Sequence, residues 1–595
     1  MKYYPQLSEL PATRQMIEVF RGYNHNLRIG DGEFYDMKNL TSNDFPVLSP
    51  RSKRGVYVSS GIPQGMVAKE SLCYVDSGDI VINGERVAMG LTIERDEDGN
   101  IIPKNLISMG AYVIVMPDKK YINTSDITDH GNIEASITTS EPVSFVLCTL
   151  DGADLDVYVG TKSNPTLDKG WIEFQKLHPD AYYLDSSATP PVLKQYSSSS
   201  GNYESIATTY IKISYPGIGL SFEVYDGVKI EGIKDERLAD LNNTMVVWAK
   251  GDDYIVVTGV PSATLTQEEP ITFTRQMPTM DFVVESENRL WGCRYGQSLN
   301  GEMVNEIYAS KLGDFKNWNC FMGAATDSYA VTVGTDGAFT GAIAYLGYPI
   351  FFKEGCMHKL YGNYPANYQV VTTACRGVQK GCSRSLAIVN ETLLYKSRTA
   401  VCAYDGALPY EISAPLGDIS YSNASAGTLG NKYYISMLDE KGKYNLFVYD
   451  VLKGMWHRED NTRALAFCNC GGDLYYIEPN HNHIKSIRGT GTPETSPVEW
   501  EAVTGVIGTD SPDKKYISRL DVRMSLEHGS RVYIFAQYDS VGAWEQLYTM
   551  TGVTLRSFSV PIRPKRCDHL RLKIVGVGEA KIYSICKTIE QGSDI

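Results

Sequence analysis

Short runs of alternating hydrophobic and polar residues fill most of the chain, a pattern that predicts β-strands joined by polar or glycine-rich turns. Between residues 345 and 480 one arrangement recurs four times: a turn, a strand with aromatic residues, a polar turn and a second strand. The first strands of the four copies are 347–352, 390–395, 430–434 and 471–476. Equivalent aromatic residues are 43, 39 and 42 positions apart. This period favours β-propeller blades, four-stranded sheets that must pack on their neighbours.

Weaker copies of the pattern lie upstream, at 71–84, 109–115 and 288–309, so we expect six or seven blades. The period breaks between Asn123 and about Asp281, where strands of a different spacing predict an inserted β-barrel or sandwich. After Pro493 the period stops, and alternating strands predict a C-terminal β-sandwich. The expected divisions are 1–60 (N-terminal arm and propeller-closing segment), 61–128 (first part of the propeller), 129–262 (insert), 263–492 (second part of the propeller) and 493–595 (sandwich).

One helix is expected near the start of the chain. The segment 8–20 has Pro11 early and apolar residues at Met16, Ile17 and Phe20, which are spaced for one face of a helix. The predicted fold class is therefore all-β, a β-propeller with an inserted β-domain and a C-terminal β-sandwich, with this segment as the exception.

The composition agrees with a folded β-protein. Of 595 residues, 53 are Gly and 40 are Tyr, and no run of 18 apolar residues could cross a bilayer. The first residues lack the charged-then-apolar order of a secretory signal, and 12 scattered Cys are too sparse for a disulfide scaffold, so we expect folding in a cytoplasm without an obligatory disulfide. The net charge of −14 disfavours wrapping DNA on the outer surface, although it permits DNA to slide through an acidic conduit.

Propellers often carry enzymes, but the sequence supplies few of the parts. The turn at 539–544 has the wrong spacing for a sialidase-type aspartate box, and the acidic pairs 235–236 and 252–253 are typical of solvated turns. The run 481–483 predicts a polar hairpin tip, and Cys468 and Cys470 have no second Cys or His pair at zinc spacing. No nucleotide-binding fingerprint occurs. We therefore expect no catalytic residue, no cofactor and no metal, and a protein that is not an enzyme.

Two basic clusters are the candidate contact sites. Either cluster can meet DNA phosphates or an acidic partner subunit, and the alternative is a solvated loop. The candidate residues are Arg51, Lys53 and Arg54 in the first cluster and Arg563, Lys565 and Arg566 in the second.

Three turn-rich stretches resemble bacteriophage virion proteins of the tail-nozzle or packaged-DNA-stabilisation type, β-propeller proteins of the conduit below the portal. The stretches are 27–57, then 224–232 with 241–244, and 307–318 with 333–337. The resemblance covers most of residues 20–490, and its motifs are structural rather than catalytic. The segment 562–595 is only loosely similar.

The resemblance implies a structural virion protein, made in the host cytoplasm and located in the viral tail. Its partners would be itself, in a ring of six or twelve copies, together with the portal or adaptor, other tail proteins and the packaged double-stranded DNA in the lumen. Two alternatives stay open. One is a tail-tip protein that binds host glycan through aromatic platforms such as Tyr433, Tyr434 or Trp456, and the other is a glycan-degrading propeller enzyme.

Overall fold

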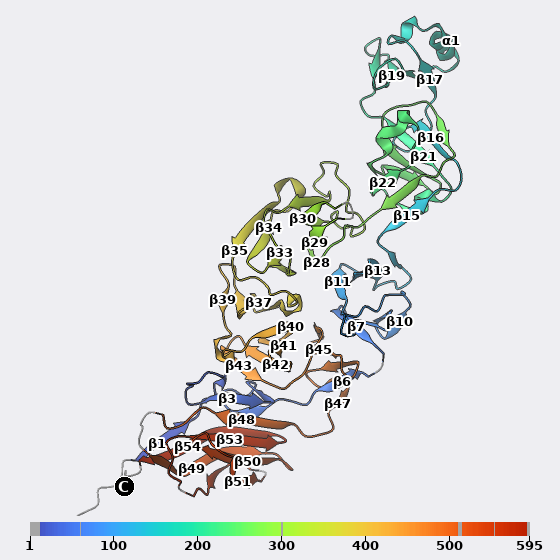
Figure 1. Cartoon of the computed structure of the whole chain (residues 1–595). Helices are drawn as coiled ribbons and strands as arrows, with labels where there is room; N and C mark the ends of the chain where they lie inside the picture. The colour runs from blue at the N-terminus through green and yellow to red at the C-terminus, as the bar shows by residue number, and fades with distance from the viewer. Residues whose placement is uncertain are drawn as a thin grey trace, which may run out of the picture.

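The chain is built almost entirely of β-strands, and the all-β prediction is confirmed (Figure 1). The structure is a computed structural model that describes residues 12–59, 61–298, 301–509, 514–552, 554–563 and 565–591. The molecule is elongated, with the C-terminal strands at one end, the inserted segment at the other and a group of small antiparallel sheets between them.

The central part contains seven four-stranded antiparallel units, numbered here in chain order. Unit 1 consists of β7 (Pro63–Ala68), β8 (Leu72–Asp76), β9 (Asp79–Ile82) and β10 (Glu85–Val87). Unit 2 consists of β11 (Asn105–Met109), β12 (Tyr112–Met116), β13 (Lys120–Asn123) and β14 (His130–Asn132). Unit 3 consists of β28 (Phe282–Ser286), β29 (Arg289–Gln297), β30 (Met303–Ala309) and β31 (Tyr329–Thr332). Units 4 and 5 consist of β32 (Gly341–Tyr345), β33 (Tyr348–Lys353), β34 (Cys356–Tyr361) and β35 (Gln369–Ala374); and β36 (Ala387–Val389), β37 (Thr392–Lys396), β38 (Val401–Tyr404) and β39 (Tyr410–Glu411). Unit 6 consists of β40 (Tyr421–Leu429), β41 (Lys432–Asp439), β42 (Tyr444–Asp450) and β43 (Met455–Arg458).

Unit 7 combines strands from two distant parts of the chain. Its first three strands are β44 (Phe467–Cys470), β45 (Asp473–Glu478) and β46 (His483–Ser486), and the fourth is β6 (Gly55–Val58), which pairs antiparallel with β46. The short strand β47 (Thr492–Pro493) pairs with the other edge of β6. Gly471 and Gly472 both have positive φ angles (58° and 76°), which gives the tight hairpin between β44 and β45 a backbone twist that suits antiparallel strands.

Hydrophobic clusters join each unit to the next. Leu72 of unit 1 packs in one cluster with Tyr475 and Ile477 of unit 7, so the first and last units are in contact as well. The first strands of successive units also lie close together, namely β7 with β11, β11 with β28, β28 with β32, β36 with β40, β40 with β44, and β44 with β7. Between units 4 and 5, β32 contacts the 3₁₀ turn η4 (Ser383–Ser385), which immediately precedes β36. The first strands of successive units therefore lie next to one another.

The insert leaves unit 2 after β14 and returns before β28. One sheet contains β15 (Ala135–Thr138), β27 (Thr272–Arg275), β22 (Gly227–Glu231) and β23 (Thr244–Val246), and a second contains β24 (Ala249–Gly251), β25 (Tyr254–Thr258), β21 (Tyr210–Ser214), β16 (Val143–Cys148) and β26 (Leu265–Gln267). Their apolar side chains form one core. The expected end of the insert at residue 262 is wrong, because β26 and β27 follow it and pair with β16 and β15.

A third sheet of the insert carries a helix, which the sequence analysis did not predict. It contains β17 (Val157–Gly160), β18 (Tyr182–Asp185), β19 (Val192–Ser197) and β20 (Asn202–Ser205), with β17 and β18 parallel. The helix α1 (Lys169–Leu177) connects these two strands, and Asp168 caps its N-terminus through its side chain. Trp171 of α1 is fully buried against Tyr183 of the sheet. Short helical turns elsewhere are α2 (Ile218–Ser221), η1 (Pro165–Leu167), η2 (Glu236–Leu241), η3 (Pro365–Asn367) and η5 (Ala414–Leu416).

The C-terminal module has two sheets whose inner faces share one core. One sheet contains β1 (Ala12–Ile17), β54 (Ala580–Gln591), β49 (Lys515–Leu526) and β52 (Arg556–Val560), and the other contains β3 (Glu33–Lys38), β48 (Glu499–Thr504), β53 (Leu570–Val577), β50 (Arg531–Tyr538) and β51 (Glu545–Thr551). The N-terminal strands β1 and β3 therefore complete sheets formed otherwise by residues after 493. A separate two-stranded pair, β4 (Leu40–Thr41) and β5 (Ser49–Pro50), precedes β6.

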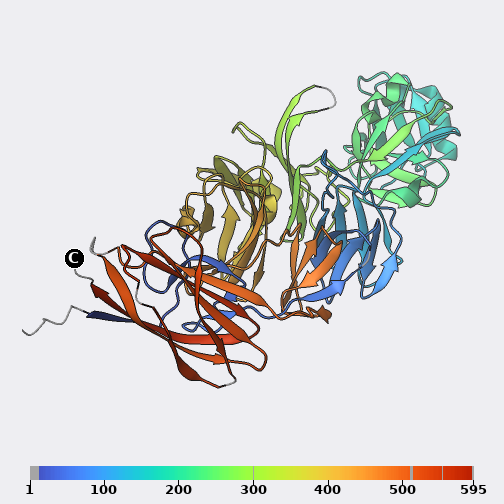
Figure 2. The same ribbon diagram turned by 60° about the horizontal axis from the view of Figure 1, so that its bottom comes forward.

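One continuous hydrogen-bonded sheet joins the C-terminal module to unit 6. The strand β2 (Gly22–Tyr23) pairs with β43 on one side and with β3 on the other, which gives a ten-stranded sheet from β40 to β51. The C-terminal module is thus attached to the outer strand of unit 6, and Figure 2 shows it and the insert at opposite sides of the central units.

The helix expected at 8–20 is wrong for its described part. Residues Ala12–Ile17 form β1, which pairs antiparallel with β54 along six consecutive residues. A helix of this length gains little by itself, whereas pairing with the long edge of β54 satisfies the backbone groups that face β54 along the whole segment. The beginning of the predicted helix, 8–11, lies outside the described residues.

Candidate functional site

The first basic cluster is part of a buried ion-pair network. Arg51 and Arg54 lie between β5 and β6, and the acids that face them follow β43 and β47. Arg54 Nη2 is 2.6 Å from Glu459 Oε2 and its Nη1 is 3.0 Å from Asp460 Oδ2. Arg51 Nη1 is 3.0 Å from Glu494 Oε2. The network therefore links the segment before β6 to the end of unit 6 and to the chain after unit 7.

The charges in this network depend on one another. Burial by itself would raise the pKa of Asp460, but the nearby Arg54 guanidinium and the hydrogen bonds from Thr462 together hold that pKa below its ordinary value. Arg54 is 3% exposed and Glu459 is also 3% exposed, so neither charge is solvated by bulk water. Removing Arg54 would leave Glu459 and Asp460 with Arg51 alone, whose nitrogens are 4.0 and 3.9 Å from their carboxylate oxygens.

The structure corrects the expected role of Arg51 and Arg54. Both are buried and ion-paired, so neither faces solvent to meet DNA or a partner subunit. Lys53, between them, is exposed, with Nζ 3.5 Å from the carbonyl oxygen of Thr495. The sequence offers no local signal for this network, because Glu459 and Asp460 are about 400 positions from the arginines that they bind.

The second basic cluster lies on the surface of the C-terminal module. Arg563, Lys565 and Arg566 are all exposed, and Lys565 Nζ is 2.7 Å from Glu545 Oε1 of β51. Both side chains of this ion pair are more than half exposed, so water and salt strongly screen the attraction between them. The described residues of this cluster remain accessible to a partner.

The first strands of the seven units carry almost no charge. Glu285 of β28 is the one acidic or basic residue within β7, β11, β28, β32, β36, β40 and β44, and its Oε1 accepts a hydrogen bond from the backbone of Asn288. Glycoside hydrolysis ordinarily requires two carboxyl groups on either side of the scissile bond. These strands do not supply that pair.

A single arginine connects two units that do not follow each other in the chain. Arg384, in η4 before unit 5, donates through Nη2 to the carbonyl oxygens of Pro103 and Lys104, which precede unit 2. Burial lowers the pKa of Arg384 to about 10, so the side chain is charged at neutral pH. Units 2 and 5 are three places apart in the order of contacts, and this contact therefore joins units that are not neighbours in that order.

The aromatic residues considered as glycan platforms are buried. Tyr433 is fully buried and donates to the carbonyl oxygen of Ser385 at 2.6 Å, and Trp456 is 1% exposed and donates to Ile412 at 2.7 Å. Tyr434 is 5% exposed. These side chains stabilise unit 6, and none presents a flat face to a sugar.

The acidic pairs lie at turns or at the start of η2, and His481 and Asn482 lie in a hairpin turn as predicted, whereas His483 begins β46. Asp235 caps η2 and pairs with Arg237, and Asp253 accepts from the backbone of Gly217 at 2.7 Å. His481 lies in the turn between β45 and β46, where it contacts Glu478. In the part of the chain that the structure describes, no three His, Cys, Asp or Glu side chains are grouped to hold a metal ion.

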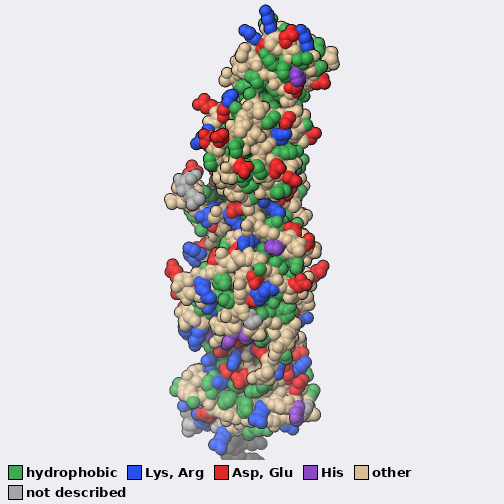
Figure 3. Space-filling view, turned by 90° about the vertical axis from the view of Figure 1, so that its right-hand side faces the viewer, with side chains coloured by type: hydrophobic (Ala, Val, Ile, Leu, Met, Phe, Trp, Pro, Cys, Tyr) green, Lys and Arg blue, Asp and Glu red, His purple; other side chains and the backbone are tan. Residues whose placement is uncertain are grey.

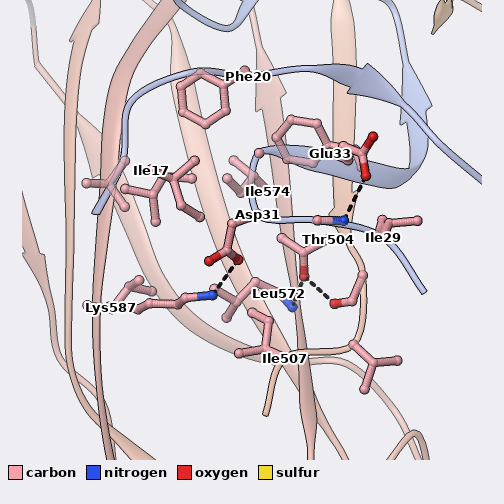
Figure 4. A pocket seen from close by; sticks show the side chains of 18 of the residues that line it. Ile17, Phe20, Ile29, Asp31, Glu33, Thr504, Ile507, Leu572, Ile574 and Lys587 are labelled. Carbon is pink, nitrogen blue, oxygen red and sulfur yellow. Dashed lines mark hydrogen bonds and ion pairs between the residues drawn. The ribbon is translucent and has the colours of Figure 1, made fainter. Parts of the chain in front are cut away.

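A narrow apolar pocket marks the junction of the N-terminal segment with the C-terminal module (Figure 4). Phe20 and Ile17 line one side, Leu572 and Ile574 line the other, and Asp31 pairs with Lys587 at 2.7 Å. Its volume of about 40 Å³ is far below the several hundred Å³ typical of ligand sites. The pocket is a packing junction that seats the N-terminal segment.

Over the described residues, we find no helix with the length and apolar character needed to span a membrane.

Comparison with known proteins gives no family. No family model and no curated protein matches the chain. Solved structures with local similarity include an exo-β-1,3-galactanase from Phanerochaete chrysosporium (9% identity, 51% of this chain and 94% of that chain, TM-score 0.21). Others are Raptor from Chaetomium thermophilum (9%, 75% and 30%, 0.29) and an acylaminoacyl peptidase from Pyrococcus horikoshii (10%, 48% and 47%, 0.23). TM-scores this low carry no argument about function.

Proposed function

We propose that the seven units form a closed seven-bladed β-propeller, and that this protein is a structural component of a bacteriophage tail, where several copies form a ring around the DNA conduit below the portal. The observation that supports closure best is the cycle of contacts among the first strands, completed by β44 and β7. The strand β6, taken from the N-terminal segment, then completes the last blade.

The character of the first strands supports a structural rather than a catalytic role. They lack a pair of carboxyl groups, and Arg384 links units 2 and 5. A propeller whose blades are tied together in this way serves as a rigid block. In the proposed ring, DNA passes along a surface shared by several copies, not through the centre of one propeller.

The elongated shape suits a subunit in the wall of a tube. The insert and the C-terminal module extend from different sides of the central units, so each can contact a neighbouring copy or the next protein along the tail (Figures 1 and 2). Acidic and basic side chains are interspersed along the face shown in Figure 3. A ring multiplies such modest contacts, because each copy binds two neighbours.

Native mass spectrometry and electron microscopy of the full chain, with and without the portal complex of the same virus, test the proposal. The expected result is a single copy in dilute solution and a ring of six or twelve copies on the portal. Binding to a host glycan by the isolated chain without any ring would refute the proposal in favour of an adhesin. Turnover of polysaccharide would refute it in favour of an enzyme.

A further inference from the structure

A polar cavity lies beside the buried ion-pair network, between units 6 and 7 and the segment 41–54. We call it the junction cavity. Its volume is about 640 Å³, and exposed residues such as Asn43, Ser52 and Asn431 line its opening. Such a volume is within the range of small-molecule sites. None of the functions considered above uses it.

The lining of the junction cavity is predominantly basic. Five of its side chains are Lys or Arg and two are Asp or Glu. Arg51 and Arg54 are neutralised by the buried acids described above, and Lys453 Nζ lies 3.3 Å from Asp450 Oδ2. The remaining two cations, Lys432 and Arg488, are within 4.0 Å of no acid among the described residues, although Glu459 and Asp450 lie near Lys432.

Lys432 is held in place by neutral oxygens only. Its Nζ donates to Thr41 Oγ1 at 2.8 Å and to Asn43 Oδ1 at 2.6 Å. These bonds fix the direction of the ammonium group without neutralising it. Burial lowers the pKa of Lys432 to about 8, so the group is still mostly charged at pH 7. A fixed, partly desolvated cation attracts an anion more strongly than a mobile surface lysine does.

Tyr434 adds an unused donor to the same cavity. Tyr434 is 5% exposed and lines the cavity. Its hydroxyl makes no hydrogen bond to any described residue. The hydroxyl is not among the buried polar atoms that lack a partner, so its oxygen is open to the space of the cavity. Arg488 lies close enough to lower the pKa of this phenol, although burial raises that pKa more. The two side chains therefore act on the same region of the cavity.

We infer that the junction cavity binds a phosphate oxyanion through Lys432, Arg488 and the hydroxyl of Tyr434. Two cations and an uncharged donor suit a group with more than one negative charge and several acceptor oxygens, and Arg is well matched to phosphate geometry. The volume accommodates two or more linked phosphates. This site is independent of the proposed ring and of propeller closure.

Isothermal titration of the full chain with pyrophosphate tests the site. We expect Lys432→Met and Arg488→Gln each to weaken binding at least tenfold, and Tyr434→Phe to weaken it severalfold, while the exposed Lys441→Met, in the turn between β41 and β42, leaves it unchanged. Circular dichroism and the thermal midpoint check that each variant is folded. Arg488 is exposed, so Arg488→Gln keeps the test decisive if Lys432→Met does not fold.

A second arm identifies the source of the phosphate. The full chain is titrated with a short oligonucleotide carrying a 5′-phosphate and with the same oligonucleotide carrying a 5′-hydroxyl. Binding that requires the 5′-phosphate and is lost in Arg488→Gln supports the site with a nucleic-acid end as its ligand, whereas binding of pyrophosphate alone supports it with a small phosphorylated molecule. Absence of binding by both probes, or equal binding by the variants and the wild type, would overturn the inference.

Discussion

Replacing Arg54 by methionine is expected to open the join between the segment before β6 and units 6 and 7. The change keeps most of the side-chain volume but removes the partner of Glu459, which is 2.6 Å away and almost fully buried. It also removes the bonds to Asp460 and Thr462, at 3.0 and 2.9 Å. Breaking a buried ion pair on one side costs about 3–5 kcal/mol. The Nε of Arg54 has no partner in the native protein, which places the expected cost at the lower end of that range.

Hydrogen exchange of the β6 amides measures this cost locally, since the many modules make a single global unfolding free energy ill-defined. A loss of about 3 kcal/mol corresponds to exchange about 100-fold faster at residues 55–58. The double variant Arg54→Met/Glu459→Met is expected to recover part of the loss, because it removes the carboxylate closest to Arg54, while Asp460 keeps only Arg51 at 3.9 Å. The exposed ion pair between Lys565 and Glu545 supplies the matched control. Lys565→Met should lower stability by less than about 1 kcal/mol. Exchange as slow as in the wild type, or a double variant worse than the single one, would refute the reasoning.

Three further outcomes are expected. Burial, with a smaller contribution from Lys353, lowers the pKa of His358 to about 4, below the 6.5 of the unfolded state. Between pH 6.5 and 4 the unfolded chain therefore binds more protons than the folded chain does. Acidification through this range is expected to remove about 3 kcal/mol of stability. Thermal unfolding of His358→Gln across this range should show a shallower pH dependence, and an unchanged slope would contradict the assignment. Arg384→Met should lower the thermal midpoint by an amount that corresponds to roughly 1–3 kcal/mol, because it leaves two carbonyl groups without their donor, and no shift would mean that the contact across the units is dispensable. Gly22→Ala should detach β2 from β43, because Gly22 has φ +83° and a Cβ there would lie 2.3 Å from the carbonyl oxygen of Trp456. Limited proteolysis between unit 6 and the C-terminal module would detect the detached strand. Resistance equal to that of the wild type would count against a strict need for glycine.

The sequence predicted those elements whose signals are local. All four Tyr-rich hairpins between 345 and 480 form strand pairs where they were expected, namely β33 with β34, β37 with β38, β41 with β42, and β45 with β46. Each copy contains its own alternation and its own turn residues, so no knowledge of distant segments is needed. The helix α1 also had a local signal, since Asp168 is a good N-cap and Trp171 and Phe174 are three positions apart, but the surrounding strand patterns obscured it.

Features that depend on distant partners could not be predicted. The segment 12–17 has the composition of a short amphipathic helix, and only its pairing with β54, more than 560 positions away, makes it a strand. In the sequence, Arg51 and Arg54 look like an exposed basic cluster. Their acidic partners follow β43 and β47, which are more than 400 positions further along the chain. The junction cavity has the same origin, since its lining comes from three segments that meet only after folding.

The ten-stranded sheet gives the molecule a defined path for mechanical load. Part of the tension applied to the C-terminal module passes from strand to strand through the backbone hydrogen bonds of this sheet and crosses β2, which is two residues long. The covalent segments that join β3 to β4 and β47 to β48, with the bridge between Leu48 and Ile582, carry the rest. Within the sheet β2 has few bonds to share the force, so it is the place where the sheet separates first. Both larger blocks would remain folded on either side of the break, and the same two residues could close it again once the tension is released.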